Sequence, residues 1–95
     1  MNQIVYKYEL PNPMPYNKKQ FSLKLPMEFK ILTVGTQSEH GVLWIAIDPD
    51  AKTWQEDFII LGTGVKDNLS GKEFVGTFFI GSYVWHVFRR LSGEY

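Results

Sequence analysis

The chain has 95 residues, of which 44% are hydrophobic and 16% aromatic, so one domain spanning the chain with a single core is expected. Ten basic and ten acidic residues give a formal net charge of 0, so no overall field favours a nucleic acid polymer or an anionic membrane as partner. There is no cysteine, which excludes disulfides, zinc–thiolate sites, iron–sulfur clusters and cysteine nucleophiles.

The first residues, 1–7, lack the basic-then-apolar pattern of a signal peptide. No apolar run approaches the roughly 18 residues that a membrane span requires. We therefore expect a soluble, intracellular protein.

Alternating polar and apolar residues, many of them β-branched or aromatic, favour strands along the whole chain. The first strand is expected at about 3–10. It ends before an irregular segment, 11–19, because the prolines of that segment cannot donate to a β-ladder. A second strand is expected at 21–25, because Phe21, Leu23 and Leu25 alternate with polar residues before Pro26.

A hairpin is predicted from a third strand at 29–37 and a fourth at 42–48. The intervening 38–41 favours a four-residue loop around a type I turn. That register places Gly35 opposite Trp44, whose indole would cover the glycine. The fourth strand is apolar at nearly every position, so we expect it to be central.

Residues 48–50, Asp-Pro-Asp, predict a turn. The polar stretch 50–57 suggests one helical turn, with Trp54 folded back as an anchor. A fifth strand is expected at 58–63, and 67–71 forms a loop to the sixth.

The last third of the chain, 73–90, predicts a hairpin around Gly81-Ser82, which matches a type II′ turn. On one face this register places the cross-strand pairs Ile80–Tyr83, Phe78–Trp85, Gly76–Val87 and Phe74–Arg89. On the other face it places the pairs Phe79–Val84, Thr77–His86, Val75–Phe88 and Glu73–Arg90. Both faces are largely apolar, so the second face indicates a homo-oligomer or a partner. The predicted fold is an all-β, small antiparallel barrel or sandwich of six to seven strands, with little or no helix.

The stretch Gly62-Thr63-Gly64-Val65-Lys66 resembles a phosphate-binding loop without fitting a dinucleotide or Walker pattern. It can be a turn or bulge, or its backbone can form an anion-binding nest.

His86 is predicted to bond to Thr77, and a role as acid, base or ligand is the alternative. The chain has one other histidine, His40, so a site with several histidine ligands is not expected. The acidic residues near 48–57 lack EF-hand spacing, so no metal site is expected there either. No serine or carboxylate is placed beside His86 by local spacing, so no catalytic residue is assigned.

Several short motifs resemble a family of small, functionally uncharacterised proteins found mostly in bacteriophages. They are Lys7-Tyr8-Glu9-Leu10, Leu25-Pro26, Lys30-Ile31-Leu32, Leu43-Trp44-x-Ala46-x-Asp48-Pro49-Asp50-Ala51, Phe58-x-Ile60-x-Gly62-Thr63-Gly64, Phe74-Val75-Gly76-Thr77 and Val84-Trp85-His86-Val87-Phe88. The resemblance implies a phage-encoded protein that acts in the host cytoplasm, and it brings no catalytic residues or cofactor.

The sequence favours a non-enzymatic binding protein, such as an antagonist of host defence that sequesters a nucleotide signal or blocks a host protein. For a nucleotide, Gly62, Thr63, Gly64 and Lys66 would cradle phosphate; the base would stack on Trp44, Trp54 or Trp85; and His86 is a further candidate ligand-binding residue. A structural or assembly role in the phage particle is the alternative, and an enzyme centred on His86 is a third reading.

Overall fold

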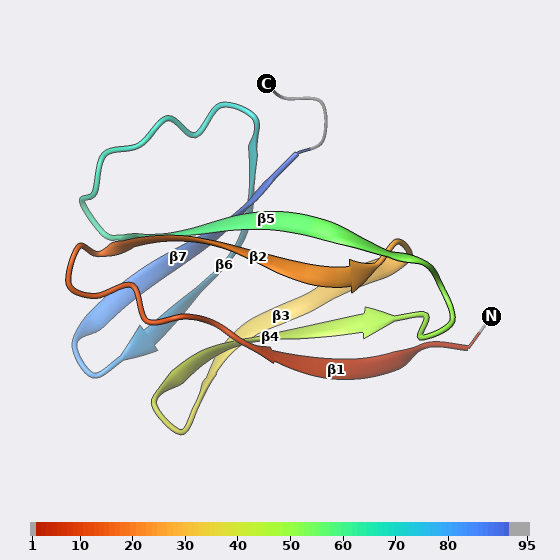
Figure 1. Cartoon of the computed structure of the whole chain (residues 1–95). Coiled ribbons are helices and arrows are strands. Elements are labelled where there is room, and N and C mark those ends of the chain that lie inside the picture. The colour runs from red at the N-terminus through yellow and green to blue at the C-terminus, as the bar shows by residue number, and fades with distance from the viewer. Residues whose placement is uncertain (1, 92–95) are drawn as a thin grey trace.

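The computed structural model describes residues 2–91, which form seven strands in two antiparallel sheets and contain no helix (Figure 1). The three-stranded sheet has the order β1 (Ile4–Glu9), β4 (His40–Ile47), β3 (Phe29–Gln37). The four-stranded sheet has the order β2 (Lys18–Pro26), β5 (Thr53–Gly62), β7 (Tyr83–Arg90), β6 (Lys72–Ile80). The all-β prediction is confirmed, and because the sheets are not closed into a barrel the fold is a sandwich.

The core lies between the two sheets and is built from alternate residues of the central strands β4, β5 and β7 and of the edge strand β6. These include Leu43, Ile45 and Ile47 of β4, Phe58 and Ile60 of β5, Phe78 of β6, and Trp85 and Val87 of β7. Each such side chain contributes roughly 1.5–3 kcal/mol when fully buried. The expectation of a central fourth strand is confirmed, since β4 lies between β1 and β3.

The two sheets approach each other closely along β3 and β6. The Thr36 hydroxyl donates a hydrogen bond to the Phe79 carbonyl oxygen at 2.9 Å. A Cβ atom at Gly76 would lie only 2.5 Å from Cγ2 of Val34, so glycine is needed for this approach. The two remaining outer strands, β1 and β2, lie at the other edges of their sheets.

The β3–β4 turn differs from the prediction. Its two residues, Ser38 and Glu39, have φ angles of 50° and 63°, as a type I′ turn requires, so the predicted four-residue loop is wrong. The ladder continues to the pair Gln37–His40, and Gly35 therefore faces Val42 rather than Trp44. The indole still covers the glycine from a diagonal position, because Nε1 of Trp44 lies 3.5 Å from where a Gly35 Cβ would be.

The expected helical turn at 50–57 is also wrong. The turn at 48–50 is present, with the Ala51 amide donating to the Asp48 carbonyl at 3.1 Å, but β5 begins at Thr53. The residues before Phe58 belong to the strand because β2 pairs antiparallel with β5 from Thr53 onwards, with Pro26 opposite Thr53. Trp54 is consequently an exposed strand residue and not a buried anchor.

The β6–β7 hairpin has the predicted turn, with Gly81 at a φ of 59°. The predicted pairs are confirmed from Ile80–Tyr83 to Gly76–Val87, and a β-bulge then shifts the register. Phe74 consequently pairs with Phe88 rather than with Arg89, and their rings meet edge to face at 5.5 Å. One face of the hairpin lies in the core, and the other is the outer face of the four-stranded sheet.

Candidate functional site

The outer face of the four-stranded sheet carries a row of polar side chains that crosses all four strands. Ser22 of β2 pairs with Asp57 of β5, and Lys72 of β6 pairs with Arg90 of β7. An ion pair of 3.7 Å between Arg90 and Asp57 joins the two halves. We call Ser22, Asp57, Arg90 and Lys72 the polar row.

A second row lies beside the polar row and is mostly apolar. It consists of Gln20, Ile59, Phe88 and Phe74, which are successive partners across β2, β5, β7 and β6. Ile59 is buried although it faces outwards, so this part of the sheet face is covered. The long connection from β5 to β6 passes over this end of the sheet (Figure 1).

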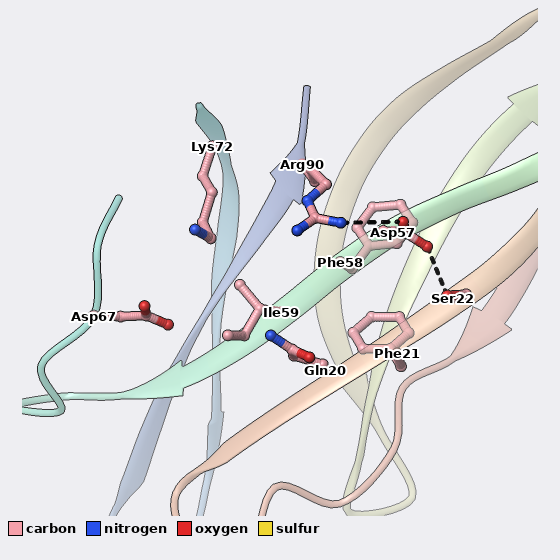
Figure 2. A pocket seen from close by; sticks show the side chains of 9 residues that line it. All are labelled: Gln20, Phe21, Ser22, Asp57, Phe58, Ile59, Asp67, Lys72 and Arg90. Carbon is pink, nitrogen blue, oxygen red and sulfur yellow. Dashed lines mark hydrogen bonds and ion pairs between the residues drawn. The ribbon is translucent and has the colours of Figure 1, made fainter. Parts of the chain in front are cut away.

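A pocket of about 320 Å³ opens between these two rows and the β5–β6 connection (Figure 2). Its volume lies at the lower end of the range of about 300–1,000 Å³ that is usual for small-molecule sites. Its lining consists of Gln20, Phe21, Ser22, Asp57, Phe58, Ile59, Asp67, Lys72 and Arg90. We refer to it as the sheet-face pocket.

Asp57 is held at one wall by several donors. Its Oδ1 accepts hydrogen bonds from the Ser22 hydroxyl at 2.7 Å and from the Gln55 amide at 2.9 Å, while Arg90 approaches Oδ2 (Figure 2). The hydrogen bonds from Gln55 and then Ser22 lower the pKa of Asp57; burial raises it by less, and the charge of Arg90 adds the smallest lowering effect. The carboxylate is therefore ionised and positioned as an acceptor at neutral pH.

This lowered pKa predicts a loss of stability in acid that depends on Asp57. Because the pKa is lower in the folded chain than in the unfolded chain, the stabilisation is complete above the ordinary pKa of about 4 and is lost as the pH falls through the folded value. Urea unfolding of the wild type and of Asp57→Asn should give a difference in free energy that is constant near neutral pH and shrinks below about pH 4. A difference that stays constant at every acidic pH would contradict the assignment.

The opposite wall is the β5–β6 connection, which is tied down by two contacts. Asp67 forms an ion pair with Lys18 at 3.4 Å, and the ammonium of Lys72 donates to the Asn68 carbonyl oxygen at 2.6 Å. The carbonyl is neutral, and none of the ion pairs within residues 2–91 involves Lys72. Lys72 and Arg90 are direct cross-strand partners, and their charged ends are directed to the two walls of the pocket, Lys72 to the connection and Arg90 to Asp57 (Figure 2).

The glycine-containing stretch 62–66 forms a turn beside the pocket and does not line it. The Gly62 amide donates to the Asn17 carbonyl at 2.7 Å, the Thr63 amide to Val84 at 3.3 Å, and the Val65 amide to Gly62 at 3.1 Å. Gly64 has a φ of 89°, the left-handed region that favours glycine. Three of the N–H groups that a phosphate nest would offer are thus directed to carbonyls of the chain itself.

His86 lies one row further along the sheet and is bonded through both ring nitrogens. Nδ1 is 2.9 Å from the Thr77 hydroxyl, as predicted, and Nε2 is 2.9 Å from the Thr63 hydroxyl. The structure therefore brings together Thr63 and His86 of the predicted site residues. Lys66 follows in the connection and is not among the residues that line the pocket.

The three tryptophans lie in three different places. Trp85 is buried in the core against Phe78 and Tyr83, with ring centroids 5.5 Å away in each case. Trp44 is on the three-stranded sheet, and Trp54 is exposed at the start of β5. They do not converge with the stretch 62–66 around one ligand position.

A smaller cavity of about 240 Å³ lies at the end of the sandwich that Trp85 and Tyr83 approach. It is bounded by the segment Leu10–Met14, by the β3–β4 turn and by Phe78 and Ile80. We refer to it as the end cavity.

The residues of the sheet-face pocket were not among those predicted from the sequence. The one local signal was the alternation in Lys18–Lys24, which puts Gln20 and Ser22 on the same face of a strand. Asp57, Lys72 and Arg90 are far apart along the chain and become neighbours only through the strand order β2-β5-β7-β6.

The fold and the pocket define the class of the protein as a small all-β sandwich with a polar pocket on one outer sheet face. The chain belongs to the family described as a domain of unknown function, DUF7352, which matches residues 1–94. No curated protein and no solved structure matches it. Residues 2–91 contain no helix long and apolar enough to cross a membrane, and no group of three or more potential metal ligands.

Proposed function

We propose that the chain is a non-enzymatic binding protein that holds a nucleotide in the sheet-face pocket. The observation that carries the proposal is the pair of cations, Lys72 and Arg90, which lie on neighbouring strands and both line that pocket. An ammonium and a guanidinium placed together suit a phosphate group, which accepts charge-assisted hydrogen bonds from both.

The other lining groups favour a nucleotide over a simple anion. Asp57 and Asp67 are acceptors, and they would repel a bare phosphate but receive hydrogen bonds from sugar hydroxyls or a base amino group. Gln20 offers both a donor and an acceptor beside the apolar surface of Ile59. A ligand with an anionic end and a donor-rich end matches this distribution.

The arrangement of His86 argues against a catalytic role for this residue. Both of its ring nitrogens are engaged by threonine hydroxyls, which orient the imidazole within the sheet face. A general acid or base must instead be directed at a reacting group.

The biological setting of this proposal is host defence. A phage-encoded protein in the host cytoplasm that binds a nucleotide signal tightly would lower its free concentration without any chemistry. Blocking of a host protein is the other form of the same antagonism.

Isothermal titration calorimetry with a panel of cyclic and linear nucleotides tests the proposal. We expect at least one nucleotide to bind, and inorganic phosphate to bind more weakly. Lys72→Gln should weaken the affinity for that nucleotide by about 10–100-fold, which is the effect of losing one charge-assisted hydrogen bond. Lys24→Gln is the matched control, because Lys24 is an exposed lysine of β2 outside the pocket.

Two outcomes of this titration would overturn the proposal. The first is the absence of heat with every nucleotide of the panel. The second is binding that Lys72→Gln and Lys24→Gln weaken equally, because that would place the anion outside the sheet-face pocket.

A structural or assembly role in the phage particle is the second candidate, and the outer face of the β6–β7 hairpin favours it. Phe74 and Phe79 are both exposed on that face, next to the half-buried Val84 and Phe88. Each of the two rings extends an apolar cross-strand pair, Phe74–Phe88 or Phe79–Val84, and exposed apolar side chains are typical of contact surfaces. Co-purification of the chain with virions, lost in a Phe74→Ser/Phe79→Ser variant, would support this role.

A further inference from the structure

The end cavity is lined by three aromatic rings that are in contact with one another through Trp85. Trp85 and Phe78 are both nearly fully buried, so the cavity reaches into the core. The ring of Tyr83, which is half exposed, stacks on the indole of Trp85 at an interplanar angle of 12°. The ring of Phe78 is tilted by 40° to the same indole. A ligand in this cavity would therefore meet aromatic surface that is shielded from water.

The wall opposite the rings is held in place by hydrogen bonds within the chain. It consists of the segment Leu10–Met14. The Leu10 amide donates to the Gly41 carbonyl oxygen at 2.8 Å, and the Met14 amide donates to Oδ1 of Asn12 at 3.0 Å. Prolines at positions 11 and 13 fix two further φ angles of the segment. A wall that is already ordered reduces the entropy that a ligand must overcome on binding.

Glu39, from the β3–β4 turn, gives the cavity a negative charge. It is the one carboxylate among the described residues that line the cavity, and none of these residues is a lysine or an arginine. The side chain is exposed, and none of the ion pairs within residues 2–91 involves it. The electrostatic character of the lining therefore favours a cation.

The backbone of Glu39 adopts a conformation that its side chain disfavours. Its φ of 63° lies in the left-handed region, at the second central position of the type I′ turn. Glycine is strongly preferred at that position, because other L-residues are strained there. The stability of the turn therefore does not account for a glutamate at this position, whereas its place in the lining of the cavity gives the carboxylate a role.

We propose that the end cavity binds a small organic cation, an alkylated ammonium. The faces of aromatic rings attract such a cation, and the attraction is stronger where water is excluded. Glu39 adds a charge of opposite sign. An inorganic cation such as Ca²⁺ would instead need six to eight oxygen ligands. The volume of about 240 Å³ lies below the range of about 300–1,000 Å³ that is usual for drug-sized ligands, which favours a small ammonium compound.

A two-dimensional NMR titration with choline chloride tests the proposal, with sodium chloride at equal concentration as the control for ionic strength. We expect shifts at the amides of His40, Gly41 and Tyr83 and at the indole N–H of Trp85. The neutral alcohol 3,3-dimethylbutan-1-ol has the shape of choline without its charge, and it should bind about tenfold more weakly or worse. The proposal is overturned if the alcohol binds as tightly as choline. It is also overturned if about 10 mM choline, ten times a Kd of about 1 mM, causes no shift at these residues.

Three variants separate the charge of Glu39 from the aromatic surface. Glu39→Gln should weaken choline binding by about two- to fivefold, whereas Glu28→Gln, at an exposed glutamate outside the cavity, should leave it unchanged. Tyr83→Leu keeps an apolar side chain without the ring and should weaken binding by about three- to thirtyfold.

Equal effects of Glu39→Gln and Glu28→Gln, or full affinity in Tyr83→Leu, would contradict the proposal. Glu39→Gly guards against loss of the fold as an explanation, since it should weaken choline binding while the urea midpoint stays the same or rises. None of the residues that line the end cavity lines the sheet-face pocket, so these results leave the nucleotide proposal unaffected.

Discussion

Phe78→Ala should lower the free energy of unfolding by about 3–5 kcal/mol, the usual effect of removing a core phenylalanine. Phe78 is only 2% exposed and packs against Trp85 between the two sheets. Its ring also contacts the backbone of β4, since a Cβ at Gly41 would lie 2.6 Å from it. Urea unfolding followed by tryptophan fluorescence measures the loss.

The matched control is the next residue of the same strand. Phe79 is 61% exposed on the outer face, so Phe79→Ala should change the free energy of unfolding by about 0.5 kcal/mol or less. Equal losses for the two variants would contradict the assignment of Phe78 to the core face and Phe79 to the outer face of the β6–β7 hairpin. The comparison therefore tests the register of that hairpin together with the position of the core.

Arg89→Met should lower the free energy of unfolding by about 3–5 kcal/mol, because it leaves a buried carboxylate without its counter-ion. Glu56 is 5% exposed, and its Oε1 accepts a hydrogen bond from Nε of Arg89 at 3.0 Å. The guanidinium also lies 5.1 Å from the centre of the Phe29 ring, so its loss removes a cation–π contact from β3. Chemical unfolding at neutral pH measures the effect.

Two further variants separate the charge effect from lost packing. Glu56→Gln in the Arg89→Met background removes the unpaired charge and should restore part of the stability. Arg90→Met removes an ion pair whose side chains are 50% and 37% exposed, so its effect should be about 1 kcal/mol or less. If the double variant were no more stable than Arg89→Met, burial of the Glu56 charge would not be the cause.

The elements that could be predicted from the sequence are those with local signals. Strand β3 was predicted with its observed ends, and the β6–β7 hairpin was predicted from Gly81-Ser82 and the alternation on either side of it. The Asp48–Asp50 turn follows from an aspartate before a proline. In each case the residues that decide the structure are adjacent in the chain.

The errors arose where tertiary pairing overrides local preference. Ser38 and Glu39 adopt positive φ angles although neither is glycine, because the β3–β4 ladder continues to the turn. The stretch 50–57 is polar, yet from Thr53 it is a strand because β2 lies beside it along its whole length. The bulge at Val75 leaves no signal in a run of residues that all favour strands.

The candidate site was hidden for a related reason. The sequence predicted a local cluster at 62–66 with tryptophans, because adjacent residues are all that a motif can reveal. The sheet-face pocket instead depends on Asp57, Lys72 and Arg90, which belong to three strands. The strand order β2-β5-β7-β6 is set by packing of the core, so the spacing of residues along the sequence does not predict it.

The measurement that tests the sheet-face pocket most directly is a two-dimensional NMR titration of the isotope-labelled chain with the nucleotide panel. We expect the largest amide shifts at Gln20, Asp57, Lys72 and Arg90, with smaller shifts in the β5–β6 connection. Shifts concentrated instead around the end cavity, at residues such as Leu10, His40 and Tyr83, would contradict it, as would a spectrum that no nucleotide changes.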